Sequence, residues 1–120
     1  MTRQETDYVQ SGINYNFNNL RLLHQAFTRK SYSAEHHGVQ DNEVLEFYGD
    51  AVLDFFVTKH LYERFSKIVN NELISEKNED ELTKLKSIIV SKNSLARCMY
   101  NFGFSQYLYL YCFEKKKGQR

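Results

Sequence analysis

The longest patterned run of hydrophobic positions in the chain lies between residues 42 and 66. At about 100° per residue, its first three turns gather the acids on an arc of about 80° and place apolar side chains around most of the rest. The acids are Glu43, Glu46, Asp50 and Asp54. Farther along, Val57 and Leu61 occupy the line that the acids hold earlier. The pattern predicts one long helix, ending at about Ser66, with an acidic stripe confined to its first three turns.

The acidic stripe is open to more than one interpretation. A row of acids on a helix is most often its solvated face. However, residues 42–57 contain no Lys or Arg to balance the acids, and Gly49 in mid-helix costs about 1 kcal/mol relative to Ala. The stripe therefore favours a divalent metal ion, a basic partner or open water. Gly49 indicates either close approach of a ligand to the backbone or a crossing helix.

Shorter segments predict the other elements. Residues 1–12 lack clear periodicity and predict a frayed start with room for a short helix. Asn19 is a reasonable N-cap for a helix over residues 20–27. Residues 67–78 are polar and predict a connection with a turn of helix around residues 72–75.

Two more helices are expected in the C-terminal half. Asn78 and Glu81 have the spacing of a capping box at the start of one helix. Asn93 or Ser94 caps the next, which Gly103 closes. The chain has no Pro and only 5 Gly, which favours long helices over a turn-rich β fold.

The length and composition of the chain limit the kinds of protein it can be. A chain of 120 residues with 42% hydrophobic content and no linker-like stretch predicts a single domain over residues 1–120. Cys98 and Cys112 form neither a CxxC motif nor a zinc-binding spacing, so both are expected to be reduced thiols. No signal peptide or membrane-spanning run is evident. These features predict a cytoplasmic protein with no membrane partner.

The charge of the chain says little about whether it binds nucleic acid. The formal net charge of +1 does not single out a nucleic-acid-binding protein. After Glu81, however, the only acid is Glu114, so the C-terminal third is basic. The aromatic run at residues 107–113 is more typical of core or dimer packing than of a base-stacking platform.

The run from Asn42 to Asp54, Asn-Glu-Val-Leu-Glu-Phe-Tyr-Gly-Asp-Ala-Val-Leu-Asp, resembles the signature helix of the ribonuclease III family. That family reads Asn-Glu-Arg-Leu-Glu-Phe-Leu-Gly-Asp at this place. Val44 and Tyr48 depart from the family pattern, and neither change removes a carboxylate. The segments at residues 26–32 and 79–96 are also similar to family segments, and the resemblance spans about residues 13–110.

The resemblance implies an all-α, ribonuclease III-like helical domain built around a buried signature helix. It implies a Mg²⁺-dependent endoribonuclease that cleaves double-stranded RNA, with Mn²⁺ as a possible substitute ion. The metal ligands by resemblance are Glu46 and Asp50, and Glu43 and Glu79 are acids near the cleavage site. Carboxylates that hold Mg²⁺ are suited to phosphodiester hydrolysis because they provide the oxygen ligands that this ion favours.

Basic residues and Phe47 complete the expected site. The cations expected to bind RNA are Lys30, Lys84 and Lys86. The segment from Thr28 to Ser31 is suited to holding phosphates, although its cations could equally complement a helix C-terminus. The family forms homodimers through the signature helix, so a homodimer is expected with Phe47 at the contact. The alternative for Phe47 is an ordinary core residue.

The chain also departs from the family. The Asp and Glu of a later family helix have no counterpart, and no double-stranded-RNA-binding domain is evident. The favoured interpretation is a fragment of a longer ribonuclease. The alternatives are a non-catalytic relative that serves as an RNA-binding or dimerisation module, and a helical interaction scaffold without an RNA partner.

Overall fold

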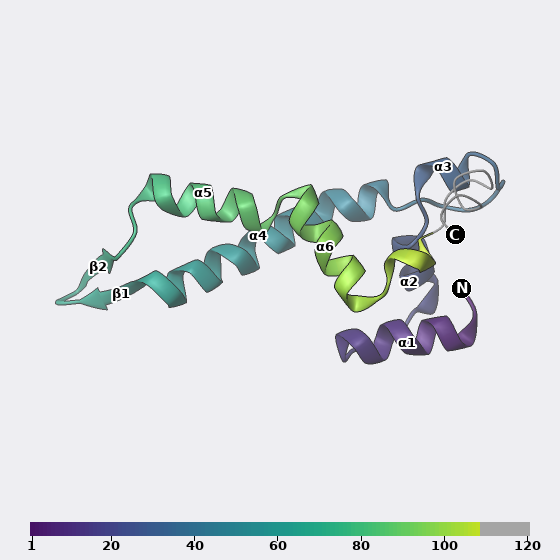
Figure 1. Cartoon of the computed structure of the whole chain (residues 1–120), viewed down its shortest axis with the longest axis horizontal. Helices are drawn as coiled ribbons and strands as arrows, with labels where there is room; N and C mark the ends of the chain where they lie inside the picture. The colour runs from purple at the N-terminus through teal and green to yellow at the C-terminus, as the bar shows by residue number, and fades with distance from the viewer. Residues whose placement is uncertain (109–120) are drawn as a thin grey trace. The chain divides into compact units, whose positions relative to one another are not determined.

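The computed structural model describes residues 1–108, and they are mostly helical (Figure 1). The elements are α1 (Arg3–Ile13), α2 (Leu20–Ala26), α3 (Lys30–Ser33), α4 (Glu43–Phe65), β1 (Ser66–Val69), β2 (Glu72–Ser75), α5 (Glu79–Ile89), α6 (Lys92–Phe102) and the 3-10 turn η1 (Ser105–Tyr107). The predicted helical class is confirmed, since the only strands of the described chain form a small hairpin. The predictions for Cys112, Glu114 and the basic tail lie outside the described residues.

The chain divides into two compact units. We call residues 1–47 together with the chain from residue 99 onward the terminal unit, and residues 48–98 the central unit. Helices α4 and α6 each run from one unit into the other. The single domain expected from composition stays a prediction.

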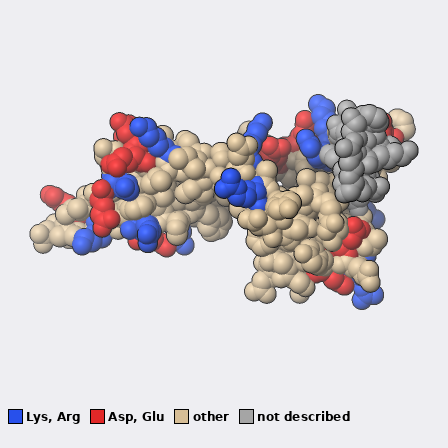
Figure 2. Space-filling view, in the orientation of Figure 1, with Lys and Arg blue, Asp and Glu red and all other residues tan. Residues whose placement is uncertain are grey.

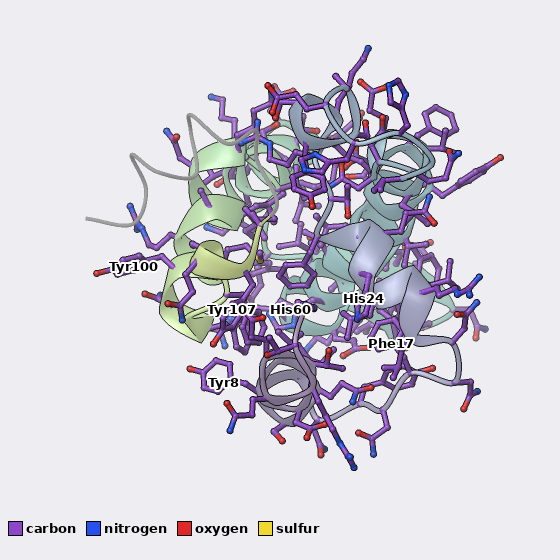
Figure 3. The ribbon with its side chains drawn as sticks, turned by 90° about the vertical axis from the view of Figure 1, so that its right-hand side faces the viewer. Tyr8, Phe17, His24, His60, Tyr100 and Tyr107 are labelled. Atoms are coloured by element: carbon purple, nitrogen blue, oxygen red, sulfur yellow. The ribbon has the colours of Figure 1, made fainter. Side chains whose placement is uncertain are left out.

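The terminal unit has an aromatic-rich core. Its buried members are Val9, Leu23, Phe27 and Phe104. The rings of Phe27 and Phe104 meet edge to face with centroids 6.4 Å apart. Figure 3 shows Tyr8 of α1 close to Tyr107 of η1, and their ring centroids are 5.9 Å apart. This core therefore joins α1 and α2 to the segment that follows α6.

Helix α1 is longer and better capped than its sequence indicates. It spans 11 residues, and Thr2 and Glu5 form a reciprocal capping box at its start. The Glu5 N–H donates to Thr2 Oγ1 at 3.1 Å, and the Thr2 N–H donates to Glu5 Oε1 at 2.8 Å. Thr6 and Val9 are its buried residues. The prediction of a frayed start underestimates this segment because burial of one narrow face was enough to fix the helix.

Helix α4 has the predicted length but is not buried. Among its 23 residues only Val57 and Leu61 are buried, on the line that the acids occupy earlier. Phe47 is 71% exposed, and Phe55 and Phe56 are exposed as well. The expectation of a buried signature helix is therefore wrong for the described chain. The sequence gives α4 apolar side chains around most of its circumference, and the described residues cover only part of them.

The segment predicted as a connection with a helical turn is a β-hairpin. Strands β1 and β2 pair antiparallel, from Ser66 opposite Ser75 to Val69 opposite Glu72. The two loop residues, Asn70 and Asn71, have φ angles of 51° and 65°. Positive φ at both positions is the requirement of a type I′ turn, and Asn tolerates it better than most residues. The turn reverses the chain, so α5 heads back in the direction from which α4 came (Figure 1).

Most of the predicted caps are confirmed. Asn19 accepts a hydrogen bond from the Arg21 N–H, and Asn78 with Glu81 forms the capping box of α5. Gly103 ends α6 with a φ of 75°. The cap of α6 was predicted at residue 93 or 94, but Ser91 Oγ accepts from the Ser94 N–H at 3.2 Å.

Charged side chains of both signs lie interspersed over the hairpin and the start of α5 (Figure 2). Lys77 and Glu81 form an ion pair there at 3.8 Å. No described helix is long and apolar enough to cross a membrane.

Candidate active site

The first turn of α4 is docked onto the elements that precede it. The Asn42 N–H donates to Thr28 O at 2.9 Å, and the Asn42 side-chain amide donates to Ala26 O at 2.9 Å. On the neighbouring residue, Asp41 O accepts from the Gln25 amide at 3.1 Å. These bonds tie the residues before α4 to the C-terminal end of α2.

Asp41 also prepares the start of the helix. Its Oδ1 accepts from the Glu43 N–H at 3.0 Å, which satisfies one of the unpaired donors of the first turn. Its Oδ2 accepts from the Ser33 hydroxyl at 3.3 Å. Asp41 is therefore the residue that caps α4, one of the two options that the sequence left open.

The acids of the stripe differ in their partners. Glu43 pairs with Lys30 at 3.6 Å, with 56% and 73% of the respective side chains exposed. Such an exposed pair contributes little to stability, but it places a cation beside the first acid of the stripe. Glu46 and Asp50 are exposed and form no ion pair with any described residue. The two carboxylates are therefore accessible for another cation.

Glu46 and Asp50 lie four residues apart on α4, and helical geometry places such residues on one face. Mg²⁺ prefers oxygen ligands, keeps several waters, and is usually bound by one or two carboxylates. The pair fits that preference. No group of three or more His, Cys, Asp or Glu side chains suited to a metal ion occurs among the described residues.

Gly49 lies between these two acids, and the space around it is open. A Cβ added there would meet no described atom within 4 Å. No described helix therefore packs closely enough against Gly49 to explain the glycine.

The remaining predicted residues lie on α5. Glu79 is its first residue and is exposed, as is Lys84, whereas Lys86 is half-buried. Among the described residues, none of the acids of α5 joins a cluster of three candidate metal ligands. The roles expected for Glu79, Lys84 and Lys86 stay predictions.

The phosphate-holding segment is only partly available. Thr28 is 3% exposed, and its hydroxyl donates to His24 O at 2.7 Å. Thr28 is therefore a structural residue, contrary to its expected contact with phosphate. Arg29 and Lys30 are exposed.

Sequence reasoning missed the docking role of Gln25, Ser33 and Asn42. Nothing in the sequence pairs Asn42 with Ala26, because this hydrogen bond depends on how α2 and α4 meet. The sequence held one signal for this role. Asp41 and Asn42 are both suited to cap α4, and one residue is enough for the cap, so the other was left for a different contact.

Away from the stripe, His24 of α2 is perturbed. Burial, and secondly the positive charge of the N-terminal amine, lower the pKa of His24 below its usual value of 6.5. Its Nε2 lies 3.5 Å from the buried Thr6 hydroxyl. His24 is labelled in Figure 3.

Comparison with known proteins agrees with the resemblance. The sequence pattern of the family described as Ribonuclease-III-like matches residues 19–120. Ribonuclease 3 of Treponema succinifaciens is 74% identical over 110 residues, which cover 92% of this chain and 30% of that protein. Ribonuclease 3 of Roseburia hominis is 46% identical over 122 residues, covering 90% of this chain and 34% of that protein.

A solved structure is similar as well. The nuclease domain of ribonuclease III from Campylobacter jejuni, described with structural flexibility in a region involved in dimer formation, matches with a TM-score of 0.76 and 28% identity. The match covers 93% of this chain and 69% of that chain. The chain spans about a third of the length of the two curated relatives named above. With matches in sequence pattern, in relatives and in fold, this chain belongs to the ribonuclease III-like family.

Proposed function

We propose that the chain is the nuclease part of an endoribonuclease that hydrolyses phosphodiester bonds in double-stranded RNA. The observation that carries the proposal is the pair of exposed carboxylates, Glu46 and Asp50, one turn apart on α4 without an ion-pair partner in the described chain. Two acids repel each other on a helix, so their placement is favourable once a cation lies between them. Family membership supports the same assignment.

In this proposal Glu46 and Asp50 hold Mg²⁺, and Mn²⁺ is suited to the same oxygen ligands. When bound, the ion supplies a nucleophilic water and stabilises charge on the phosphate oxygens. Glu43 and Glu79 are assigned to the neighbourhood of the scissile phosphate. Lys30, which lies 3.6 Å from Glu43, brings a positive charge to this end of the stripe and is available to an RNA phosphate.

Substrate recognition follows from charge and shape. Double-stranded RNA is read mainly by its shape, its phosphates and its 2′-hydroxyls. Lys30, Lys84 and Lys86 are the cations we assign to the phosphates. Lys84 and Lys86 lie on one helix, so both of these contacts depend on how α5 is placed against the duplex.

We further propose a homodimer formed through α4. Phe47 is 71% exposed and Phe55 is 64% exposed. At about 100° per residue the two lie within about 80° of each other around α4, and large exposed apolar side chains on one side of a helix are typical of a protein interface. The Campylobacter jejuni nuclease domain has a region involved in dimer formation. We place Phe47 at the contact and the protein in the cytoplasm, with residues 1–120 acting as one domain.

One observation favours a second candidate function. The alternative is a non-catalytic RNA-binding or dimerisation module, which the exposed apolar side chains of α4, Phe47 among them, would also suit. Such a module would retain the fold and the apolar face of α4 but would not cut RNA.

Incubation of the chain with long double-stranded RNA and Mg²⁺ separates the two functions. We expect cleavage by the parent and a loss of at least about a hundredfold in the Asp50→Asn variant, because a neutral amide is a poor ligand for the ion. Bound but uncut RNA in a gel-shift assay of the parent would instead support the module. If the parent neither cleaves nor binds the RNA, both candidate functions are contradicted.

A further inference from the structure

Asn42 occupies the N-cap position of α4 but does not cap the helix. Its carbonyl oxygen accepts the first helical hydrogen bond, from the Glu46 N–H at 2.8 Å. An Asn at this position normally turns its side-chain oxygen toward the amides of the first turn. Here the side-chain amide instead donates to Ala26 O, the last residue of α2, at 2.9 Å. Asp41 caps the first turn in its place.

Two asparagines at the N-caps of other helices behave differently. Asn19 Oδ1 accepts from the Arg21 N–H at 3.0 Å, and Asn78 Oδ1 accepts from the Glu81 N–H at 2.9 Å. Both side chains serve their own helix. At α4 the two roles belong to two residues, because Asp41 caps the helix and Asn42 bonds it to α2.

The docking acts on the acidic stripe because it fixes how α4 begins. Asn42 is bonded to Ala26 and Thr28 on one side and to Glu46 on the other. Gln25 holds the preceding carbonyl, Asp41 O, at 3.1 Å. A helix whose first turn is fixed at these points cannot rotate freely about its axis, so the directions of the Glu43 and Glu46 side chains are set by α2.

We infer that Asn42, supported by Gln25, is a positioning residue that aims Glu46, the first proposed metal ligand of the α4 stripe, at a metal ion. The inference rests on the proposed function and adds a specific determinant to it. Residues that orient metal ligands without touching the metal change metal affinity by about 10- to 100-fold when they are replaced. Asn42 acts on Glu46 through the backbone, because its carbonyl oxygen accepts the Glu46 N–H, so we expect the lower end of this range.

Two variants test the inference, and each spares the acids. Asn42→Asp keeps the size and the capping ability of the side chain but removes the donor to Ala26 O. Its added negative charge would by itself raise affinity for a cation, so weaker binding cannot be an effect of charge. Gln25→Met removes the donor to Asp41 O and leaves the sequence of α4 unchanged. Asn19→Asp is the matched control, because its capping contact needs only an acceptor oxygen.

The measurement is a titration of the ¹⁵N-labelled chain with Mn²⁺ alone, followed by paramagnetic broadening of the Glu46 and Asp50 amide signals. We expect the Mn²⁺ concentration at half-effect to rise about tenfold in Asn42→Asp and less in Gln25→Met, with Asn19→Asp unchanged. Amide exchange of Glu43 and Glu46 should accelerate in the first two variants. Circular dichroism checks that each variant keeps its helical content.

The outcomes are distinguishable. If the parent shows no broadening at Glu46 and Asp50, the proposed function fails and the inference fails with it. If the parent binds Mn²⁺ and both docking variants bind it equally well, only the inference fails. Loss of helical content in both variants would make the docking a folding determinant and would also overturn the positioning role.

Discussion

The two units of this chain bury their apolar side chains very differently. In the terminal unit, Val9 and Phe104 are 2% and 3% exposed and belong to one aromatic-rich core. In the central unit, only Val57 and Leu61 are buried, while Phe55, Ile68 and Ile88 are each about 60% exposed. The terminal unit thus contains a core of its own, whereas the central unit leaves many of its large apolar side chains exposed.

Replacing one phenylalanine in each unit should give the largest difference between the two units. Phe27→Ala in the terminal core should lower the free energy of unfolding by about 3–5 kcal/mol, because Phe27 is 7% exposed and packs on Phe104. Phe55→Ala in the central unit should change it by no more than about 0.5 kcal/mol in dilute solution. Urea denaturation followed by circular dichroism measures both. Equal losses would show that the central unit has a core of its own.

Two helical glycines give a second matched pair. A Cβ at Gly12 would lie 2.7 Å from Phe104 Cζ, and Phe104 cannot easily yield because it is buried and stacked on Phe102. Gly12→Ala should therefore destabilise the chain, by about 1–3 kcal/mol for the overpacking less the gain in helix propensity. Gly49→Ala meets no described atom and should stabilise the chain by about 1 kcal/mol.

Melting temperatures of the two glycine variants should move in opposite directions. A fall for Gly49→Ala in dilute solution would mean that its surroundings are closed, contrary to the structure. If the proposed homodimer packs closely at Gly49, the same variant should associate more weakly in analytical ultracentrifugation while its monomer is more stable.

The smallest effect concerns pH and is confined to the terminal unit. The lowered pKa of His24 means that the unfolded chain binds this proton more readily than the folded chain does. Stability from this residue is therefore fully present above the unfolded pKa of about 6.5 and is lost as the pH falls toward the folded pKa. His24→Gln should flatten the dependence of the melting temperature on pH below about 6.5. An unchanged profile would exclude His24 as a source of that dependence.

The elements that sequence predicted well are those fixed by local chemistry. Asn19 and Asn78 cap the helices they were expected to cap, because the contact needs only the next few residues. The length of α4 followed from its unbroken helical pattern, and the placement of Val57 and Leu61 on the line of the acids was correct. The hairpin was missed although Asn70 and Asn71 lie between the apolar pairs Ile68-Val69 and Leu73-Ile74, and Asn tolerates the positive φ angles of a tight turn.

What sequence could not supply depends on segments far apart in the chain. The exposure of Phe47 contradicts both a buried helix and an ordinary core residue, since an apolar side chain looks the same in the sequence whether it faces a core or a partner. The candidate site shows the same limit. Glu46 and Asp50 were picked out by their spacing and by resemblance, whereas the contact of Asn42 with Ala26 requires the meeting of two helices.

The contact between α1 and the end of α6 has a consequence for synthesis. The Tyr8 hydroxyl donates to Phe102 O at 3.3 Å across 94 positions of sequence, and Phe104 completes the core that Val9 and Phe27 begin. On a ribosome, which releases the chain from its N-terminus, the first helices emerge long before their partner does. The hairpin pairs neighbouring strands and can close early, whereas the terminal core must wait until residue 104 has left the exit tunnel. Helix α1 is thus synthesised before the hairpin but reaches its final packing after it.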